Sequence, residues 1–194
     1  MTDADSTGKG LQLRTVICSP CGILGYGFPL ASFEAAMREK PDFIVVDAGS
    51  TDAGPHKLGA GVGIVSRRAT KKDLGILLYG ARELGIPLIV GSAGGSGART
   101  HTEWTMDIVR EILGEMVWNP KVAVIWADID KVHIMEKAAA GQVVKMSPNV
   151  PDLTEDSLDQ TNGVVAQMGA EPVMAALSQG AQVIICGRAY DPAP

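Results

Sequence analysis

The sequence lacks a long apolar run, a block of basic residues and a large share of aromatic side chains. No run approaches the roughly 20 apolar residues that a helix needs to span a bilayer. Basic residues gather only in pairs, at Arg67-Arg68 and Lys71-Lys72, the net charge is −5, and aromatic residues make up 5% of the chain. Because nucleic-acid binding depends on clustered Lys and Arg, these absences argue against a membrane-spanning protein and against a nucleic-acid-binding protein.

Cysteine is also scarce. The chain has three cysteines, an odd number, and its first ten residues, MTDADSTGKG, are polar and acidic, unlike a secretory or mitochondrial leader. A disulfide framework is therefore not expected. We expect a cytoplasmic protein in which residues 1–12 form a flexible tail.

What the sequence does contain is an alternation of short apolar runs with helical stretches. Hydrophobic residues make up 46% and charged residues 20%, with 23 glycines, values typical of a globular α/β protein. Runs rich in Val and Ile predict strands covered on both faces; they are Leu13–Cys18, Phe43–Asp47, Pro87–Gly91, Val122–Ala127 and Gln182–Cys186. The helical stretches are Leu30–Lys40, Thr70–Leu84, Thr102–Met116, Lys131–Ala139 and Val164–Gln179, with a short capped turn after Thr154.

This order of elements predicts the fold class. Strand–helix alternation at this spacing favours an α/β fold with an open, mostly parallel sheet of about five strands and helices on both faces, similar to a Rossmann fold. Residues 13–194 are expected to form this domain. In such a sheet the carboxyl ends of the strands share one edge, where ligands bind. Polar stretches follow all the predicted strands, so a small-molecule site is expected at that edge, with Asp47, Gly91, Asp128 and Arg188 along it.

The glycine-rich stretch GSAGGSGA leads from the third predicted strand towards a helix. Glycine lets main-chain N–H groups approach a ligand, and a helix N-terminus favours negative charge. The pattern predicts a site for a phosphate or carboxylate, formed by Gly91, Ser92, Gly94, Gly95, Ser96 and Gly97. A tight strand-to-helix turn without a ligand is the alternative.

A second polar stretch follows the strand that ends at Asp47. Asp47 and Asp52 could bind a hard divalent cation or transfer protons, and His56 lies within reach. Ser50 and Thr51, between the two carboxylates, are candidate substrate contacts. Alternatively, Asp47 caps nearby main-chain N–H groups and Asp52 forms an Asx turn.

Arg188 and Asp191 follow the last predicted strand directly. Arginine binds a carboxylate through two parallel hydrogen bonds, so both residues are candidate substrate contacts. An internal ion pair of Arg188 with Asp191, Asp47 or Asp52 fits the sequence equally well. His101, at the start of a helix, is a candidate general base; a solvent-facing histidine is the alternative.

Cys18, Cys21 and Cys186 also lie at strand ends, so their thiolates could in principle hold an iron–sulfur cluster. A single C-x-x-C is weak evidence, however, and buried cysteine more often behaves as a small apolar residue. An iron–sulfur cluster is therefore not expected.

Five segments spread along the chain are SPCGILGYGFPLASF, DAGSTDAGPHKLG, GSAGGSGA, VVAQMGAEPV and ICGRAYDPAP. In this order they resemble the N-terminal part of the acyclic terpene utilisation (AtuA-like) proteins. The resemblance covers almost the whole chain beyond residue 12 and implies bacterial breakdown of branched or carboxylated substrates, often as coenzyme A thioesters. Cys21 stands where the family has a serine-like residue, which weakens the cluster hypothesis further.

Proteins of this family are normally much longer than this chain. The resemblance therefore implies that the chain is the N-terminal portion of a larger unit, completed by a second polypeptide or by a missing C-terminal half. An uncovered parallel sheet exposes apolar faces and strand edges, which native proteins cover. We accordingly expect a partner chain and an oligomer.

These expectations together favour an enzyme, a lyase or hydratase that acts on a small hydroxy-carboxylate or its acyl-CoA ester. Arg188 and the glycine-rich loop would hold anionic groups, while Asp47 or Asp52 would move a proton or bind a divalent metal ion. His56 or His101 would assist.

Two alternatives remain open. One is a hydrolase that uses Ser50 or Ser92 on a small carboxylated substrate, although neither serine lies in the G-x-S-x-G turn found in many hydrolases. The other is a non-catalytic ligand-binding subunit completed by a partner chain.

Overall fold

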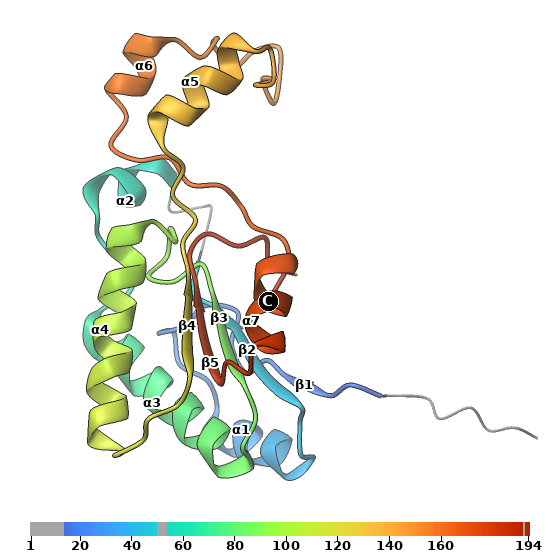
Figure 1. The fold of residues 1–194 in the computed structure, drawn as a ribbon. Helices are drawn as coiled ribbons and strands as arrows, with labels where there is room; N and C mark the ends of the chain where they lie inside the picture. Colours follow the sequence, from blue (N-terminus) through green and yellow to red (C-terminus); the bar gives the residue numbers. More distant parts are fainter. Residues whose placement is uncertain (1–13, 50–53, 192) are drawn as a thin grey trace, which may run out of the picture.

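The computed structural model describes residues 14–49, 54–191 and 193–194. These residues form a five-stranded sheet in the order β1-β2-β3-β5-β4, in which every neighbouring pair of strands is parallel (Figure 1). The predicted α/β fold with an open parallel sheet is therefore confirmed. The strands are β1 (Ile17–Cys18), β2 (Phe43–Asp47), β3 (Leu88–Gly91), β4 (Val122–Ile125) and β5 (Val183–Cys186).

Helices cover the two faces of the sheet unequally. α1 (Leu30–Arg38), α3 (Arg67–Leu84) and α4 (Arg99–Glu115) lie on one face, and α7 (Glu171–Ser178) lies on the other (Figure 1). The right-handedness of crossover connections accounts for this difference. The chain moves across the sheet in one direction from β1 to β4, and then turns back to β5, which puts α7 on the opposite face.

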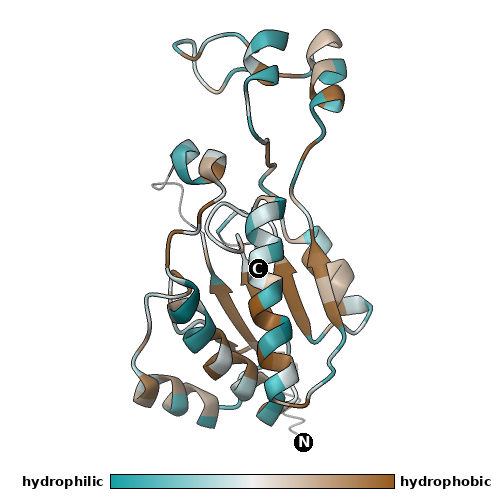
Figure 2. Ribbon diagram, turned by 90° about the vertical axis from the view of Figure 1, so that its left-hand side faces the viewer, coloured by the Kyte–Doolittle hydropathy of each residue, from teal (hydrophilic) through white to brown (hydrophobic). Residues whose placement is uncertain are grey.

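Each face of the sheet has its own apolar core. On the first face, Ile44 and Val46 of β2 pack with Leu77 of α3. On the second face, Ile184 of β5 packs with Val173 of α7. Side chains of β2 alternate between buried and half-buried, because α7 packs mainly against β4 and β5 and covers β2 less fully. Figure 2 shows the strands as the most apolar elements, with the polar sides of the helices turned outwards.

The helix boundaries follow sequence signals. The side chain of Ser66 caps α3 by accepting a main-chain hydrogen bond, and Gly85 ends it with a left-handed φ of 66°. α5 (Lys131–Ala139) has the predicted bounds, and α6 (Glu155–Asp159) follows the predicted cap at Thr154.

Three stretches differ from the prediction. Of the strand expected over Leu13–Cys18, only Ile17–Cys18 form β1 among the described residues. The helix expected over Val164–Gln179 begins only at Glu171. The residues before it pair with the strand ends instead, since the N–H groups of Ala166 and Met168 donate to carbonyl oxygens that follow β4 and β5, at 2.8 and 3.0 Å. The polar loop expected after β2 contains a further helix, α2 (Gly54–Ala60).

Residues 131–159 project away from the sheet as a helical arm formed by α5 and α6 (top of Figure 1). α5 buries none of its residues. Val144 and Met146, in the connection between the two helices, are 85% and 94% exposed. The arm therefore adds little to the apolar core of the sheet.

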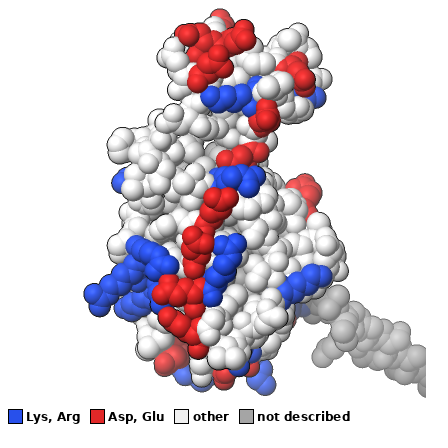
Figure 3. Space-filling view, turned by 60° about the vertical axis from the view of Figure 1, so that its left-hand side comes forward, with Lys and Arg blue, Asp and Glu red and all other residues white. Residues whose placement is uncertain are grey.

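The outer surface of α3 and α4 is charged. Arg67 and Lys71 of α3 lie 2.6 Å from the carboxylate of Glu111 on α4, and Lys71 also lies 2.7 Å from Glu115. Figure 3 shows acidic and basic side chains lying next to one another on this side of the molecule. None of the helices that the structure describes is long and apolar enough to cross a membrane.

Candidate functional site

The carboxyl ends of the strands meet along one side of the sheet, which we call the carboxyl edge. Asp47 at the end of β2 is in register with Gly91 at the end of β3, and Arg188 follows β5. Asp128 follows β4, and its carboxylate accepts a hydrogen bond of 3.1 Å from the main-chain N–H of Arg99 at the start of α4. The prediction that Asp47, Gly91, Asp128 and Arg188 share one edge is confirmed.

Two glycines make room for Arg188, which is 6% exposed. A Cβ atom at Gly49 would lie 2.8 Å from Nη1 of Arg188 and 2.3 Å from Cβ of Ser92. A Cβ atom at Gly97 would lie 2.1 Å from the main-chain nitrogen of Arg188. The missing side chain at Gly49 therefore leaves room for the guanidinium group, and the missing side chain at Gly97 lets the main chain of Arg188 pass close to the glycine-rich loop.

The charges at this edge shift the protonation of Asp47. Burial raises the pKa of Asp47 above its usual value, and the nearby charge of Asp191 raises the pKa further. A main-chain hydrogen bond at Gly49, the Ser92 hydroxyl and the Arg188 charge oppose this shift. Nη2 of Arg188 lies 3.8 Å from Oδ1 of Asp191, a long contact for an ion pair. The edge thus combines a buried cation with a carboxyl group that holds its proton more tightly than a free aspartate does.

Ser92 connects the ends of β3 and β5. Its hydroxyl accepts a hydrogen bond of 3.2 Å from the main-chain N–H of Ala189 and donates one of 3.3 Å to the carbonyl oxygen of the same residue. Ser92 is 0% exposed and has a left-handed φ of 48°, a conformation that costs a non-glycine residue about 1 kcal/mol. These contacts give Ser92 a positioning role, with its hydroxyl already engaged by the chain.

Ser96 and His101 form a second polar pair at this edge. Oγ of Ser96 is hydrogen-bonded to Nδ1 of His101 and accepts a hydrogen bond of 3.2 Å from the N–H of Ala98. His101 is 2% exposed, so the solvent-facing alternative is wrong. Burial lowers the pKa of His101, and the main chain of Val62 partly opposes the shift. The geometry at Val62 falls short of a hydrogen bond, so Nε2 of His101 is buried without a partner among the described residues.

The glycine-rich loop packs against the chain itself. Gly94 has a φ of 70°, and a Cβ atom there would lie 2.7 Å from Cβ of His101. A Cβ atom at Gly95 would lie 3.2 Å from Cγ2 of Ile64. At the start of α4, the main-chain N–H of Arg99 donates to the Asp128 carboxylate, so this N–H is not free to bind the expected anionic ligand. These contacts favour the tight-turn interpretation of the loop, and the anion site there stays a prediction.

The other predicted site residues lie apart from this cluster or outside the described residues. Ser50, Thr51 and Asp52 lie outside them, so the metal pair of Asp47 and Asp52 stays a prediction. His56 lies on α2 with its side chain exposed. Among the described residues, no group of three or more His, Cys, Asp or Glu side chains is placed to hold a metal ion.

The structure does not bring the cysteines together. Cys18 belongs to the core beneath α1 and α3, whereas Cys186 belongs to the core beneath α7 on the opposite face. Their strands are also three positions apart in the sheet, roughly 14 Å. Burial raises the pKa of Cys186 to about 12 and, with the charges of Asp73 and Asp47, raises that of Cys21 to about 11. All three thiols are therefore protonated at neutral pH, because the pKa of Cys18 is also raised by burial.

Asp73 holds a loop next to the carboxyl edge, a role that was not predicted from the sequence. It lies on α3 and is 2% exposed, and its Oδ2 atom accepts hydrogen bonds of 2.9 Å from the N–H groups of Gly25 and Gly27. The same loop is joined to the edge by a hydrogen bond of 2.9 Å from Leu24 N to Asp47 O. The sequence does contain a signal for this role, because Asp73 is a charged residue next to Leu74 within the apolar stripe of α3.

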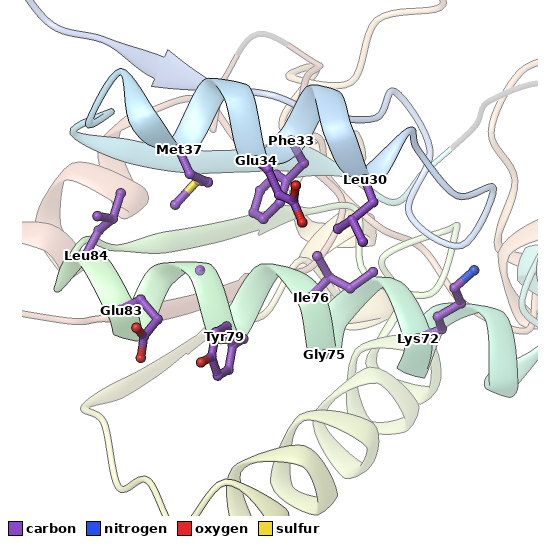
Figure 4. Close-up of a pocket in the computed structure, with 11 residues that line it drawn as sticks. Leu30, Phe33, Glu34, Met37, Lys72, Gly75, Ile76, Tyr79, Glu83 and Leu84 are labelled. Atoms are coloured by element: carbon purple, nitrogen blue, oxygen red, sulfur yellow. The ribbon is translucent and has the colours of Figure 1, made fainter.

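The described cavities lie elsewhere, and part of the edge is covered. An apolar groove of about 620 Å³ lies between α1 and α3 (Figure 4), and three further cavities are likewise lined by neither Asp47 nor Arg188. Pro194 lies over the end of β3, since a Cβ atom at Gly91 would lie 2.8 Å from its Cγ. A ligand at the edge must therefore enter beside this segment.

Comparison with known proteins identifies the family of the chain. Residues 68–194, more than half of the 194-residue chain, match the family described as "Acyclic terpene utilisation family protein AtuA". The matched residues include the glycine-rich loop, His101 and Arg188 and begin after Asp47. No curated protein and no solved structure matches the chain. The resemblance found in the sequence is thus confirmed, and the chain belongs to the AtuA family of acyclic terpene utilisation proteins.

Proposed function

We propose that the chain serves acyclic terpene utilisation as a lyase or hydratase of a small hydroxy-carboxylate or its acyl-CoA ester. The observation that supports this proposal is the buried guanidinium group of Arg188 beside Asp47 at the ends of parallel strands. Ligands of open α/β sheets bind in the crevice at this edge. The family to which the chain belongs supplies the metabolic context.

Arg188 is the candidate contact for the substrate carboxylate. A guanidinium group has five N–H donors in a planar fork, which fits the two oxygens of a carboxylate. Among the described residues, its acidic partner within ion-pair distance is Asp191, at 3.8 Å, and that carboxylate is itself 75% exposed. A substrate carboxylate would accept hydrogen bonds from the guanidinium N–H groups of Arg188 that the 3.8 Å contact with Asp191 leaves without a close acceptor.

Asp47 is the candidate proton donor. A general acid is most efficient when its pKa lies near the working pH, and burial raises the pKa of Asp47 towards that range. During dehydration the protonated carboxyl group of Asp47 would give its proton to the departing hydroxyl group, which leaves as water, while a base takes a proton from the adjacent carbon so that the double bond forms. His101, whose pKa is lowered by burial, is the candidate for that base. During hydration the Asp47 carboxylate would take a proton from the attacking water, and protonated His101 would give a proton to the other carbon.

Turnover by matched variants tests this proposal. The panel contains short branched hydroxy acids and their coenzyme A thioesters, with Asp47→Asn and Arg188→Ala compared with wild type. Asp107→Asn and Arg110→Ala are the controls, because among the residues that the structure describes these two exposed α4 side chains form an ion pair with each other alone. We expect Asp47→Asn to lower kcat about 100-fold or more. Arg188→Ala should lower kcat/KM about 30-fold, mostly through KM.

Full activity in both edge variants would refute the proposal. A wild-type protein that binds members of the panel and converts none of them would instead support a non-catalytic ligand-binding subunit.

The hydrolase alternative now has a specific candidate in Ser96. Its hydroxyl is hydrogen-bonded to a buried, neutral His101, and a serine beside a basic histidine is the arrangement of a nucleophile and its general base. Ser92 is a poorer candidate, because its hydroxyl is engaged by Ala189. A fluorophosphonate probe should label Ser96 in wild type and in Ser92→Ala, and should fail to label Ser96→Ala and His101→Gln. Absence of labelling in wild type would eliminate this alternative.

A further inference from the structure

The groove between α1 and α3 exposes apolar side chains on the surface, away from the carboxyl edge (Figure 4). Phe33 of α1 packs on Gly80 of α3 at its floor, where a Cβ atom at Gly80 would lie 2.8 Å from Cζ of Phe33. Along its sides, Leu30 is 51% and Tyr79 is 60% exposed. A concave surface with exposed apolar side chains and a charged rim is typical of a protein–protein contact.

The α3 side of the groove carries a stripe of four residues, Lys72, Ile76, Tyr79 and Glu83. Their spacings of four, three and four residues place them on one face of the helix. The stripe is also symmetric along the helix. The point midway between residues 77 and 78 is equally far from Lys72 and Glu83, and equally far from Ile76 and Tyr79.

This symmetry makes the stripe complementary to itself. When two copies of α3 lie antiparallel about a two-fold axis through that midpoint, Lys72 of one copy faces Glu83 of the other at both ends. At the centre, Ile76 of one copy faces Tyr79 of the other. A two-fold interface requires such a self-complementary patch, and opposite charges at its rim fix the register of the two copies.

The surroundings of the stripe leave it available for this contact. Lys71 is held by Glu111 and Glu115 of α4, but neither Lys72 nor Glu83 takes part in an ion pair among the described residues. Beside the stripe, a Cβ atom at Gly75 would meet nothing within 4 Å. This open surface gives the Tyr79 ring of a second copy room to pack.

We propose that this groove is the interface of a homodimer, in which the α3 helices of two copies of the chain pack antiparallel. Leu30 and Met37 of α1, which line the same groove, extend the contact on either side of the helix pair. Near-antiparallel packing of two helices with apolar centres is among the common helix-packing geometries. This proposal does not depend on the proposed function, because the groove lies apart from the carboxyl edge.

Charge reversal with rescue tests the interface. Sedimentation equilibrium of the full chain compares wild type with Lys72→Glu, Glu83→Lys and the double variant, and circular dichroism confirms that each is folded. Each single reversal places like charges together at both ends of the stripe, and should raise the dimer dissociation constant roughly tenfold. The double variant restores both pairs and should return to within about threefold of wild type. Lys137→Glu, an exposed lysine on α5, is the matched control and should change nothing.

Three results would overturn the proposal. The first is a wild-type chain that stays monomeric throughout the micromolar range. The second is a dimer that neither single reversal weakens. The third is a double variant that dissociates as readily as the single variants, since the charges would then not face each other across the interface.

Discussion

The apolar core beneath α3 and the carboxyl edge of the same sheet both exclude water, but they bury different chemistry. In the core, Leu74 and Leu77 are 0% exposed and pack with other apolar side chains. At the edge, Ser92, His101 and Arg188 are 0%, 2% and 6% exposed. Burying polar groups costs free energy unless they are hydrogen-bonded or paired. Stability alone does not require polar groups at the strand ends, and the proposed ligand site would account for their burial there.

The largest effect on stability is expected in the core. Leu77→Ala removes a fully buried side chain, and should lower the free energy of unfolding by about 3 to 5 kcal/mol because a cavity remains. Urea denaturation measures the loss. Val132→Ala, at a position on α5 that is 67% exposed, is the control and should cost less than about 1 kcal/mol. Similar losses in the two variants would contradict the assignment of Leu77 to the core.

The second-largest effect on stability is expected at a glycine of the carboxyl edge. Gly97→Ala would bring a Cβ atom to 2.1 Å from Arg188 N, at a φ of 71°, and should lower the free energy of unfolding by about 3 kcal/mol. Gly114→Ala on α4 is the matched control, because a Cβ atom at Gly114 would have no neighbouring atom within 4 Å. It should raise stability by about 0.5 to 1 kcal/mol. If both variants shift stability in the same direction, the close packing at Gly97 is disproved.

Asp73 should have an intermediate effect. Asp73→Ala removes the acceptor of two hydrogen bonds from Gly25 and Gly27, and should cost about 2 kcal/mol. Asp107→Ala, on the exposed surface of α4, should cost less than about 0.5 kcal/mol. Hydrogen exchange should report the loss of protection at these two glycine amides. Unchanged exchange in Asp73→Ala would contradict the role of Asp73 in holding the loop.

The smallest effects are expected from pH, and they have opposite signs at two residues. The pKa of Asp47 is raised above 3.8 in the folded protein, so its contribution to stability is present below pH 3.8 and is lost as pH rises through the folded pKa. The pKa of His101 is lowered below 6.5, so its contribution is present above pH 6.5 and is lost as pH falls through the folded pKa.

Urea denaturation across these pH ranges checks both signs. Relative to Asp47→Asn, wild type should lose stability as pH rises from 3.8. Relative to His101→Gln, it should lose stability as pH falls below 6.5. If the stability difference between wild type and either variant changed with pH in the opposite direction, the direction of the pKa shift given for that residue would be wrong.

The sequence predicted the sheet well because its strands are short runs of Val and Ile bounded by glycine and proline. It failed over residues 164–170, where apolar residues at near-helical spacing suggested a helix. There the main-chain N–H groups of Ala166 and Met168 are bonded to residues that follow β4 and β5. No local pattern encodes a hydrogen bond to a segment distant in the chain, so the helix start was misplaced.

In the candidate site, too, some features were predictable from the sequence and others depend on contacts between distant segments. The order of strands and helices was sufficient to place Asp47 and Arg188 at one edge. The engagement of the Ser92 hydroxyl was not predictable, since its partner Ala189 lies 97 residues away. The burial of His101 against Gly94 likewise depends on how the loop folds over α4. Sequence order thus predicts where polar residues gather, whereas their hydrogen bonds depend on the tertiary structure.

Calorimetric titration of Arg188→Ala is the most direct measurement of whether the carboxyl edge is a site for anions. The ligand is a hydroxy acid or coenzyme A thioester that binds wild type, and Arg110→Ala is the control. We predict that Arg188→Ala weakens binding by about 2 kcal/mol, roughly 30-fold, and that Arg110→Ala leaves it unchanged. Unchanged affinity of Arg188→Ala together with a lower melting temperature would show instead that the buried arginine serves only to hold the loops of the edge together.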